Sequence, residues 1–83
     1  MSMYILYGQF KQYADKKGYQ LLKEDYRFIE NNIKHLHQDE QILILKEYLK
    51  RWRQGMMEGG KTPQNQNLGR FRANEYLRSV CKN

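Results

Sequence analysis

The chain has 83 residues, of which 40% are hydrophobic and 29% are charged, and its formal net charge is +6. This length fits one domain with a thin core, and a single cysteine excludes an intramolecular disulfide and suits a reducing compartment. The first ten residues lack the basic region and the long apolar run of a signal peptide or a membrane span. We therefore expect a cytoplasmic protein with no membrane association.

Helical spacing runs through the whole chain. Apolar residues recur every three or four positions, and no stretch shows the two-residue alternation of a strand. The pattern predicts an all-α fold, a compact bundle of four helices within a single domain of residues 1–83. The predicted helices span about residues 2–17, 23–36, 39–58 and 64–82.

The first two helices are predicted to be close neighbours in space. Ser2 can serve as the N-cap of the first helix, and Gly18 follows a cationic last turn as a C′ glycine. The second helix has an apolar stripe that includes Tyr26, Ile29 and Ile33. Because the connection between the two helices is short, they should be antiparallel or sharply angled.

The third helix has the clearest pattern. Asp39 is a suitable N-cap, and the apolar residues Ile42, Leu45, Leu49, Trp52 and Met56 are separated by alternating steps of three and four. We expect Trp52 to be buried against the first two helices, and we expect the second and third helices to form the centre of the bundle. Two glycines end the helix, and residues 59–65 should form a mobile loop.

The fourth helix contains a glycine within its apolar face. Gly69 and Ala73 lie one turn apart in the middle of that face. A glycine inside a helix costs about 1 kcal/mol relative to alanine, so its presence favours a close approach between two backbones. The pattern predicts that Gly69 and Ala73 pack tightly against the third helix.

Leu68 and Phe71 are assigned by the same helical wheel to the other side of the fourth helix. Two interpretations stay open for this pair. They can cover the end of the bundle or fill a seam between two copies of the chain. Alternatively, Phe71 among arginines is an exposed aromatic on which a nucleic-acid base could stack.

Basic residues are concentrated near the end of the sequence, where residues 59–83 carry five basic side chains against one acidic side chain. A second basic stripe flanks the apolar face of the third helix. Together these groups are candidate phosphate contacts: Lys46, Lys50, Arg53, Arg70, Arg72 and Arg78. The alternative is that the stripe on the third helix is a solvated edge whose aliphatic stems cover the core.

The sequence contains no pattern typical of an enzyme or a metal site. His35 and His37 are two residues apart, so on a helix they point in different directions. We find no nucleophile motif, no phosphate-binding glycine loop and no paired catalytic carboxylates. We expect no enzymatic activity, no cofactor, no metal and no small-molecule substrate.

Two functional interpretations follow from these features. The first is a small non-enzymatic interaction module that acts through its surface on a protein partner or forms a homo-oligomer. The alternative is an accessory protein that binds DNA or RNA through the fourth helix and the edge of the third. A helix-turn-helix is disfavoured, because the start of the third helix lacks outward arginine or amide side chains that could read bases.

Overall fold

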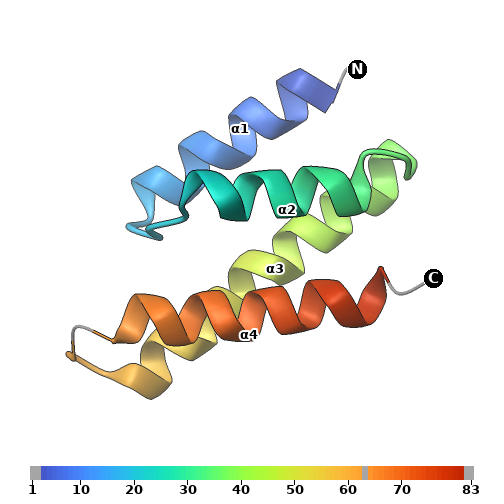
Figure 1. Cartoon of the computed structure of the whole chain (residues 1–83). Helices are drawn as coiled ribbons and strands as arrows, with labels where there is room; N and C mark the ends of the chain where they lie inside the picture. The colour runs from blue at the N-terminus through green and yellow to red at the C-terminus, as the bar shows by residue number, and fades with distance from the viewer. Residues whose placement is uncertain (1–2, 63, 82–83) are drawn as a thin grey trace.

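The computed structural model describes the backbone of residues 3–62 and 64–81, and the side chains of residues 8–62 and 64–81. This part of the chain is all-α, as predicted. It contains α1 (Met3–Lys16), α2 (Lys23–Ile33), α3 (Gln38–Gly59) and α4 (Asn65–Val80) (Figure 1).

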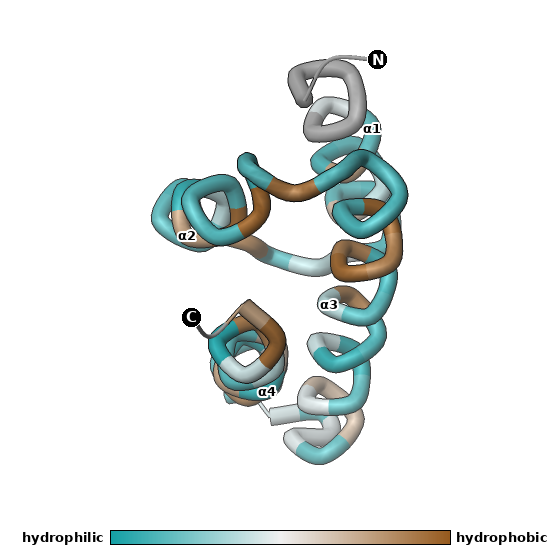
Figure 2. Tube along the Cα trace, turned by 90° about the vertical axis from the view of Figure 1, so that its right-hand side faces the viewer, coloured by the Kyte–Doolittle hydropathy of each residue, from teal (hydrophilic) through white to brown (hydrophobic). Residues whose placement is uncertain are grey.

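The helices form two layers. α2 and α4 lie side by side in one layer, and α1 and α3 lie in the other (Figure 2). The helices of one layer cross those of the other at a clear angle (Figure 1). Because α4 crosses α3 and also lies beside α2, it is next to helices of both layers.

α1 ends as the sequence predicts. Gly18 has a φ of 81°, a left-handed conformation that glycine adopts without strain. Its amide donates to the carbonyl of Asp15, and the amide of Tyr19 donates to the carbonyl of Ala14. These two bonds form a Schellman motif, which ends the helix and turns the chain toward α2. The predicted N-cap, Ser2, lies outside the described residues.

The turn between α2 and α3 differs from the prediction at both helix ends. α2 ends at Ile33 and not at residue 36, because the side-chain amide of Gln41 donates to the carbonyls of Ile33 and Leu36. These bonds satisfy backbone oxygens that would otherwise lack partners. α3 begins at Gln38 with His37 as its N-cap residue. Asp39 therefore lies in the first helical turn, where the helix dipole favours an acid.

Aromatic residues from three helices meet in the core. The ring of Phe10 from α1 packs edge-on against Tyr26 of α2 and Tyr48 of α3, and Tyr48 lies beside Trp52. Trp52 is fully buried, as predicted. Aliphatic side chains from α2, α3 and α4 complete the core: Ile29, Ile33, Leu45, Leu49 and Leu77. None of the described helices combines the length and the apolar character that crossing a membrane requires.

α3 and α4 share the most extensive contact, which corrects the prediction that the second and third helices form the centre. A Cβ atom placed on Gly69 would lie 2.7 Å from the carbonyl oxygen of Trp52. A Cβ on Gly55 would collide with the carbonyl oxygen of Leu68. Ala73 is fully buried one turn further along α4. The predicted close packing of Gly69 and Ala73 against the third helix is therefore confirmed, and Gly55 supplies the matching gap.

Local hydrogen bonds hold the connection between α3 and α4 to the adjoining ends of the two helices. The amide and the hydroxyl of Thr62 both donate to the carbonyl of Gly59. The amide of Asn65 donates to the carbonyl of Thr62, and its side chain donates to the carbonyl of Gly60. Within the predicted loop of residues 59–65, Gly59 belongs to α3 and Asn65 to α4. The mobility of this segment stays a prediction.

Candidate functional site

An apolar groove with a volume of about 610 Å³ lies between α1 and α3. We call it the α1–α3 groove. α3 contributes aliphatic side chains, and α1 with the following connection contributes aromatic ones. The apolar lining consists of Phe10, Tyr13, Tyr19, Ile42, Leu45 and Leu49. Phe10, Leu45 and Leu49 are buried in the core, whereas Tyr13 is 49% exposed and Tyr19 and Ile42 are half-buried. The groove therefore offers apolar surface that a partner could cover.

Three basic side chains line the same groove. Lys46, Lys50 and Arg53 extend from α3, and all three are exposed. A second hollow of about 570 Å³ continues the groove and shares Tyr13, Tyr19 and Arg53 with it. Lys17 lines this continuation. Among the described residues, no acidic side chain lines either part, so the charged groups of the groove are all cations.

The three cations on α3 lack ion-pair partners in the described part of the chain. The side chains of Lys46, Lys50 and Arg53 take part in no hydrogen bond or ion pair with any residue of that part, whereas Lys17 in the continuation lies 5.6 Å from the centre of the Tyr13 ring. On the same helix, away from the groove, Arg51 is paired with Glu47 at 2.7 Å. Neighbouring like charges on one helix face repel one another weakly. The groove therefore concentrates positive charge that the chain itself does not neutralise.

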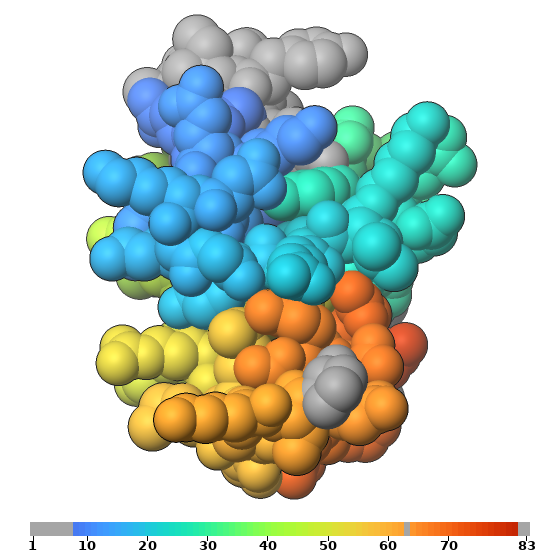
Figure 3. Space-filling model, turned by 90° about the vertical axis from the view of Figure 1, so that its left-hand side faces the viewer, coloured from blue at the N-terminus to red at the C-terminus, as the bar shows by residue number. Residues whose placement is uncertain are grey.

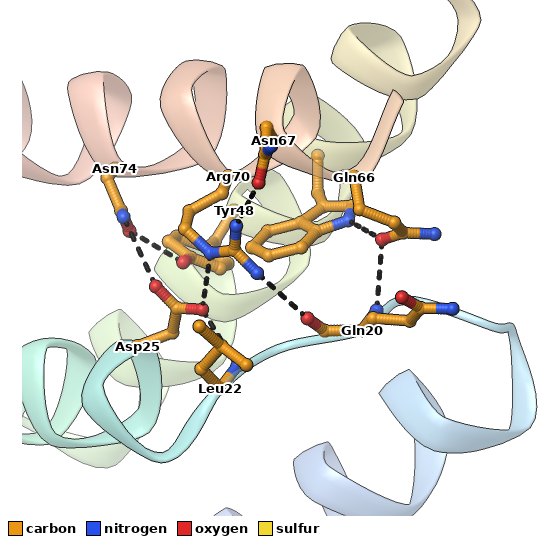
Figure 4. A network of polar contacts seen from close by, with 9 residues as sticks. Gln20, Leu22, Asp25, Tyr48, Gln66, Asn67, Arg70 and Asn74 are labelled. Atoms are coloured by element: carbon orange, nitrogen blue, oxygen red, sulfur yellow. Dashed lines mark hydrogen bonds and ion pairs between the residues drawn. The ribbon is translucent and has the colours of Figure 1, made fainter. Parts of the chain in front are cut away.

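Arg70, a predicted phosphate contact, is engaged inside the protein. Its Nε donates to Asp25 at 2.8 Å, its Nη1 donates to Asn67, and its Nη2 donates to the carbonyl of Gln20 (Figure 4). Its guanidinium also lies 5.2 Å from the centre of the Trp52 ring. With all three nitrogens bonded, the side chain joins α4 to α2 and to the α1–α2 connection.

Asp25 is the buried centre of this polar network. One of its oxygens accepts hydrogen bonds from Arg70 and from the backbone amide of Leu22, the N-cap residue of α2. Its other oxygen accepts a bond from Asn74, whose own side-chain oxygen accepts the hydroxyl proton of Tyr48 (Figure 4). Burial, with the nearby negative charge of Asp25 as a second cause, raises the pKa of the Tyr48 hydroxyl far above its usual value. Tyr48 is therefore a neutral donor.

Gln66 forms a second bridge, which joins α4 to α3 and to the connection between α1 and α2. Its side-chain oxygen accepts protons from the indole of Trp52 and from the backbone amide of Gln20, and its nitrogen donates to the carbonyl of Gly18. Figure 3 shows α1 and the α1–α2 connection directly above the end of α3 and the start of α4. Trp52 lies in close contact with Gly69 and Gln66 of α4, whereas the prediction placed it against the first two helices.

Arg72 and Arg78 lie in two further environments. Arg72 forms two hydrogen bonds with Glu58 of α3, at 2.9 and 3.1 Å. These hydrogen bonds lower the pKa of Glu58 and raise that of Arg72. Arg78 lies over the ring of Phe28 on α2, 5.2 Å from its centre. The six candidate phosphate contacts therefore have different surroundings, and only the three on α3 share one groove.

Leu68 and Phe71, predicted to act as a pair, lie in different environments. Leu68 packs toward α3, because a Cβ on Gly59 would lie 3.1 Å from its Cδ1. Phe71 is 55% exposed, and the guanidinium of Arg72 lies 5.7 Å from its ring centre. Leu68 is therefore part of the contact between α3 and α4, while Phe71 remains a surface aromatic.

The groove was not predicted from the sequence, although most of its residues had been noted. Lys46, Lys50 and Arg53 had been identified as a stripe beside the apolar face of the third helix. A stripe of aromatic residues on the first helix was a second signal, because two such stripes on neighbouring helices can enclose a groove. Nothing in either stripe gives the distance between the helices, which decides whether a groove forms.

No group of three or more histidine, cysteine or acidic side chains is gathered in a way that could hold a metal among the described residues. Comparisons with protein-family models, curated proteins and solved structures found no match for this chain.

Proposed function

We propose that this protein is a non-enzymatic interaction module that binds a segment of a partner protein in the α1–α3 groove. The observation that carries the proposal is an apolar groove of about 610 Å³ whose three cations on α3 have no side-chain hydrogen bond or ion pair within the described chain. Grooves of this kind between two helices are a common way to receive an amphipathic helix.

The aromatic residues of the groove support binding by burial. Tyr13 and Tyr19 present rigid rings with a polar tip, and such residues are enriched at protein interfaces. Tyr13 is 49% exposed, so a partner that covers it would bury apolar area that now faces water. Phe71, an exposed ring on the other layer, lines neither of these two hollows.

Site-specific photo-crosslinking tests the proposal. A photoreactive phenylalanine analogue is placed at Tyr13 in one variant and at Phe71 in another, and each is irradiated in extracts of the cells that express the protein. These positions make a matched pair, since both are aromatic, both are on helices, and their exposed fractions are 49% and 55%. We expect a discrete crosslinked protein at position 13 and none at position 71. Crosslinks at both positions or at neither would contradict the proposal.

Nucleic-acid binding is a second candidate function, and one observation favours it. Arg78 covers Phe28 and Arg72 lies near the exposed ring of Phe71, so the layer of α2 and α4 carries aromatic rings together with arginines. Single-stranded nucleic acid is bound by such combinations of stacking and charge. The commitment of Arg70 to Asp25 and of Arg72 to Glu58 weakens this candidate.

Retention on single-stranded RNA and DNA columns tests the second candidate. If it holds, retention should fall steeply as salt rises, and Phe71→Ala with Arg78→Glu should abolish it. Lys50→Glu, which changes the groove alone, is the matched control and should leave retention unchanged. Light scattering of the Phe71→Ala variant also tests self-association through this surface. If the chain self-associates there, the substitution should lower the molecular mass toward that of the monomer.

A further inference from the structure

We infer that the partner segment of the α1–α3 groove is an amphipathic helix with acidic residues along one edge of its apolar face. This inference rests on the proposed function and adds the chemistry of the partner. It follows from three properties of the groove: its length, its apolar floor and the one-sided position of its cations.

The length of the groove fits a short helix. Along α3 the lining runs from Ile42 to Arg53. At a rise of 1.5 Å per residue this segment is about 16 Å long, which corresponds to three helical turns. A partner helix lying along it would place apolar side chains at every third or fourth position against the aliphatic floor.

The cations stand in one row. Lys46, Lys50 and Arg53 follow one another at steps of four and three residues on α3, so they occupy one edge of the groove. In this part of the groove the opposite edge, from α1, presents the uncharged side chains of Gln9 and Tyr13, and Lys17 lies beyond it in the continuation. Acids on a partner helix at the same steps of four and three would lie beside the three cations. The other edge of that helix needs no charge.

The apolar lining of the groove favours a protein helix over a nucleic acid as the partner. Phosphate groups could approach the three cations, but a polar strand would leave the exposed apolar surface of Tyr13, Tyr19 and Ile42 facing water or hydrophilic atoms. A helix with leucine-like side chains would bury that surface and bring its acids to the cations at once. Apolar burial supplies most of the affinity in such a complex, and charge complementarity gives its specificity.

Three synthetic peptides test the inference. Each has about 14 residues, close to four helical turns, the same leucines on one face, and a side-chain staple on the other face that keeps it helical. The three flank positions carry glutamate, glutamine or lysine. Binding to the full chain is measured by fluorescence anisotropy at low and high salt.

We expect the glutamate peptide to bind about tenfold more tightly than the glutamine peptide, because three exposed ion pairs each contribute about a factor of two. The lysine peptide should bind most weakly, and added salt should reduce the differences. Lys50→Glu should remove most of the preference for glutamate. Lys23→Glu is the matched control: it makes the same charge change at the exposed start of α2, outside the groove, and should leave the preference unchanged.

The results separate the two proposals. Equal binding of the glutamate and glutamine peptides would overturn the acidic partner, and so would a glutamate preference that survives Lys50→Glu. If such peptides still compete with the crosslink at Tyr13, the groove remains the binding site. Failure of all three peptides to bind would also overturn the acidic helix, and the proposed function would then be decided by the Tyr13 crosslink alone.

Discussion

Between α3 and α4 the two backbones touch, whereas between α4 and the first two helices long polar side chains bridge the distance. In the first region a Cβ on Gly55 would collide with the carbonyl oxygen of Leu68 in α4. In the second region Arg70 reaches Asp25 and Gln20, and Gln66 reaches Gln20 and Gly18. We call these regions the glycine seam and the polar junction.

The two regions should respond differently to amino-acid substitution. At the glycine seam the nearest neighbours of the missing side chains are backbone atoms, which can move only if the whole helix moves. At the polar junction the contacting atoms belong to flexible side chains with several bonds each. We therefore expect the seam to reject even a methyl group, and the junction to accept substitutions that preserve volume and avoid an unpaired charge.

Trp52→Ala should have the largest effect, because Trp52 contacts both regions. It packs against Gly69 in the seam and donates its indole proton to Gln66 of the junction. Loss of this fully buried ring should lower the free energy of unfolding by about 3–5 kcal/mol, enough to unfold a small domain. Circular dichroism during thermal unfolding measures it. Trp52→Phe should lose less, and an alanine variant that melts with the parent would show that the ring does not connect the regions.

Gly55→Ala should lower the free energy of unfolding by about 3 kcal/mol, near the upper end for added volume in a packed site. Its Cβ would meet the carbonyl oxygen of Leu68 and the Cα of Gly69, so α3 and α4 would have to separate. Gly69→Ala should act in the same direction, because its Cβ would meet the carbonyl oxygen of Trp52. Urea unfolding gives both values. Unchanged or increased stability would mean that the backbones are not in contact.

Asp25→Ala should cost about 2 kcal/mol, less than the loss of a fully buried ion pair, because the Arg70 side chain keeps an exposed fraction of 22% and two other bonds. The double variant Asp25→Leu with Arg70→Met should recover most of this loss, since it leaves no unpaired charge. The single variants Asp25→Leu and Arg70→Met complete a double-mutant cycle, in which urea unfolding measures the coupling. A double variant as unstable as the sum of the single variants would show that the junction is as intolerant as the seam.

Gly8→Ala should produce the smallest change, and its sign should be opposite. Gly8 lies inside α1, and a Cβ there would meet no atom within 4 Å. Alanine should therefore stabilise the protein by about 0.5–1 kcal/mol through helix propensity alone. The same urea titration detects it. Destabilisation at this position would mean that glycine substitutions in this chain do not report on close packing.

The sequence indicated the glycine seam from one side only. Gly69 and Ala73 stood out because a glycine inside an apolar helical face is typical of a close approach between two backbones. Gly55 and Gly59 are also four residues apart on one face of the third helix, and this spacing was a readable signal. The prediction did not use it, because the interpretation of that helix followed its apolar residues; Gly59 was assigned to the helix end and Gly55 received no role.

The polar junction could not be predicted, because its members are far apart in the sequence. Asp25 and Arg70 are 45 residues apart. Each also fits its own helix without the other, Asp25 as an acid in a first turn and Arg70 as a cation on a helix surface. Helix spacing identifies which residues face inward, but it does not tell which charge on one helix meets which charge on another.

The same contrast has a consequence for the order in which the chain folds. Contacts between α3 and α4 join residues about 14 positions apart, such as Glu58 and Arg72, while contacts across the junction join residues 45 to 50 positions apart. Closing the longer loops costs about 1 kcal/mol more in chain entropy. The hairpin of α3 and α4 should therefore form first and present Gln66 and Arg70 to the first two helices. During synthesis α1 and α2 leave the ribosome before those partners exist, so the half of the protein that is made first is completed last.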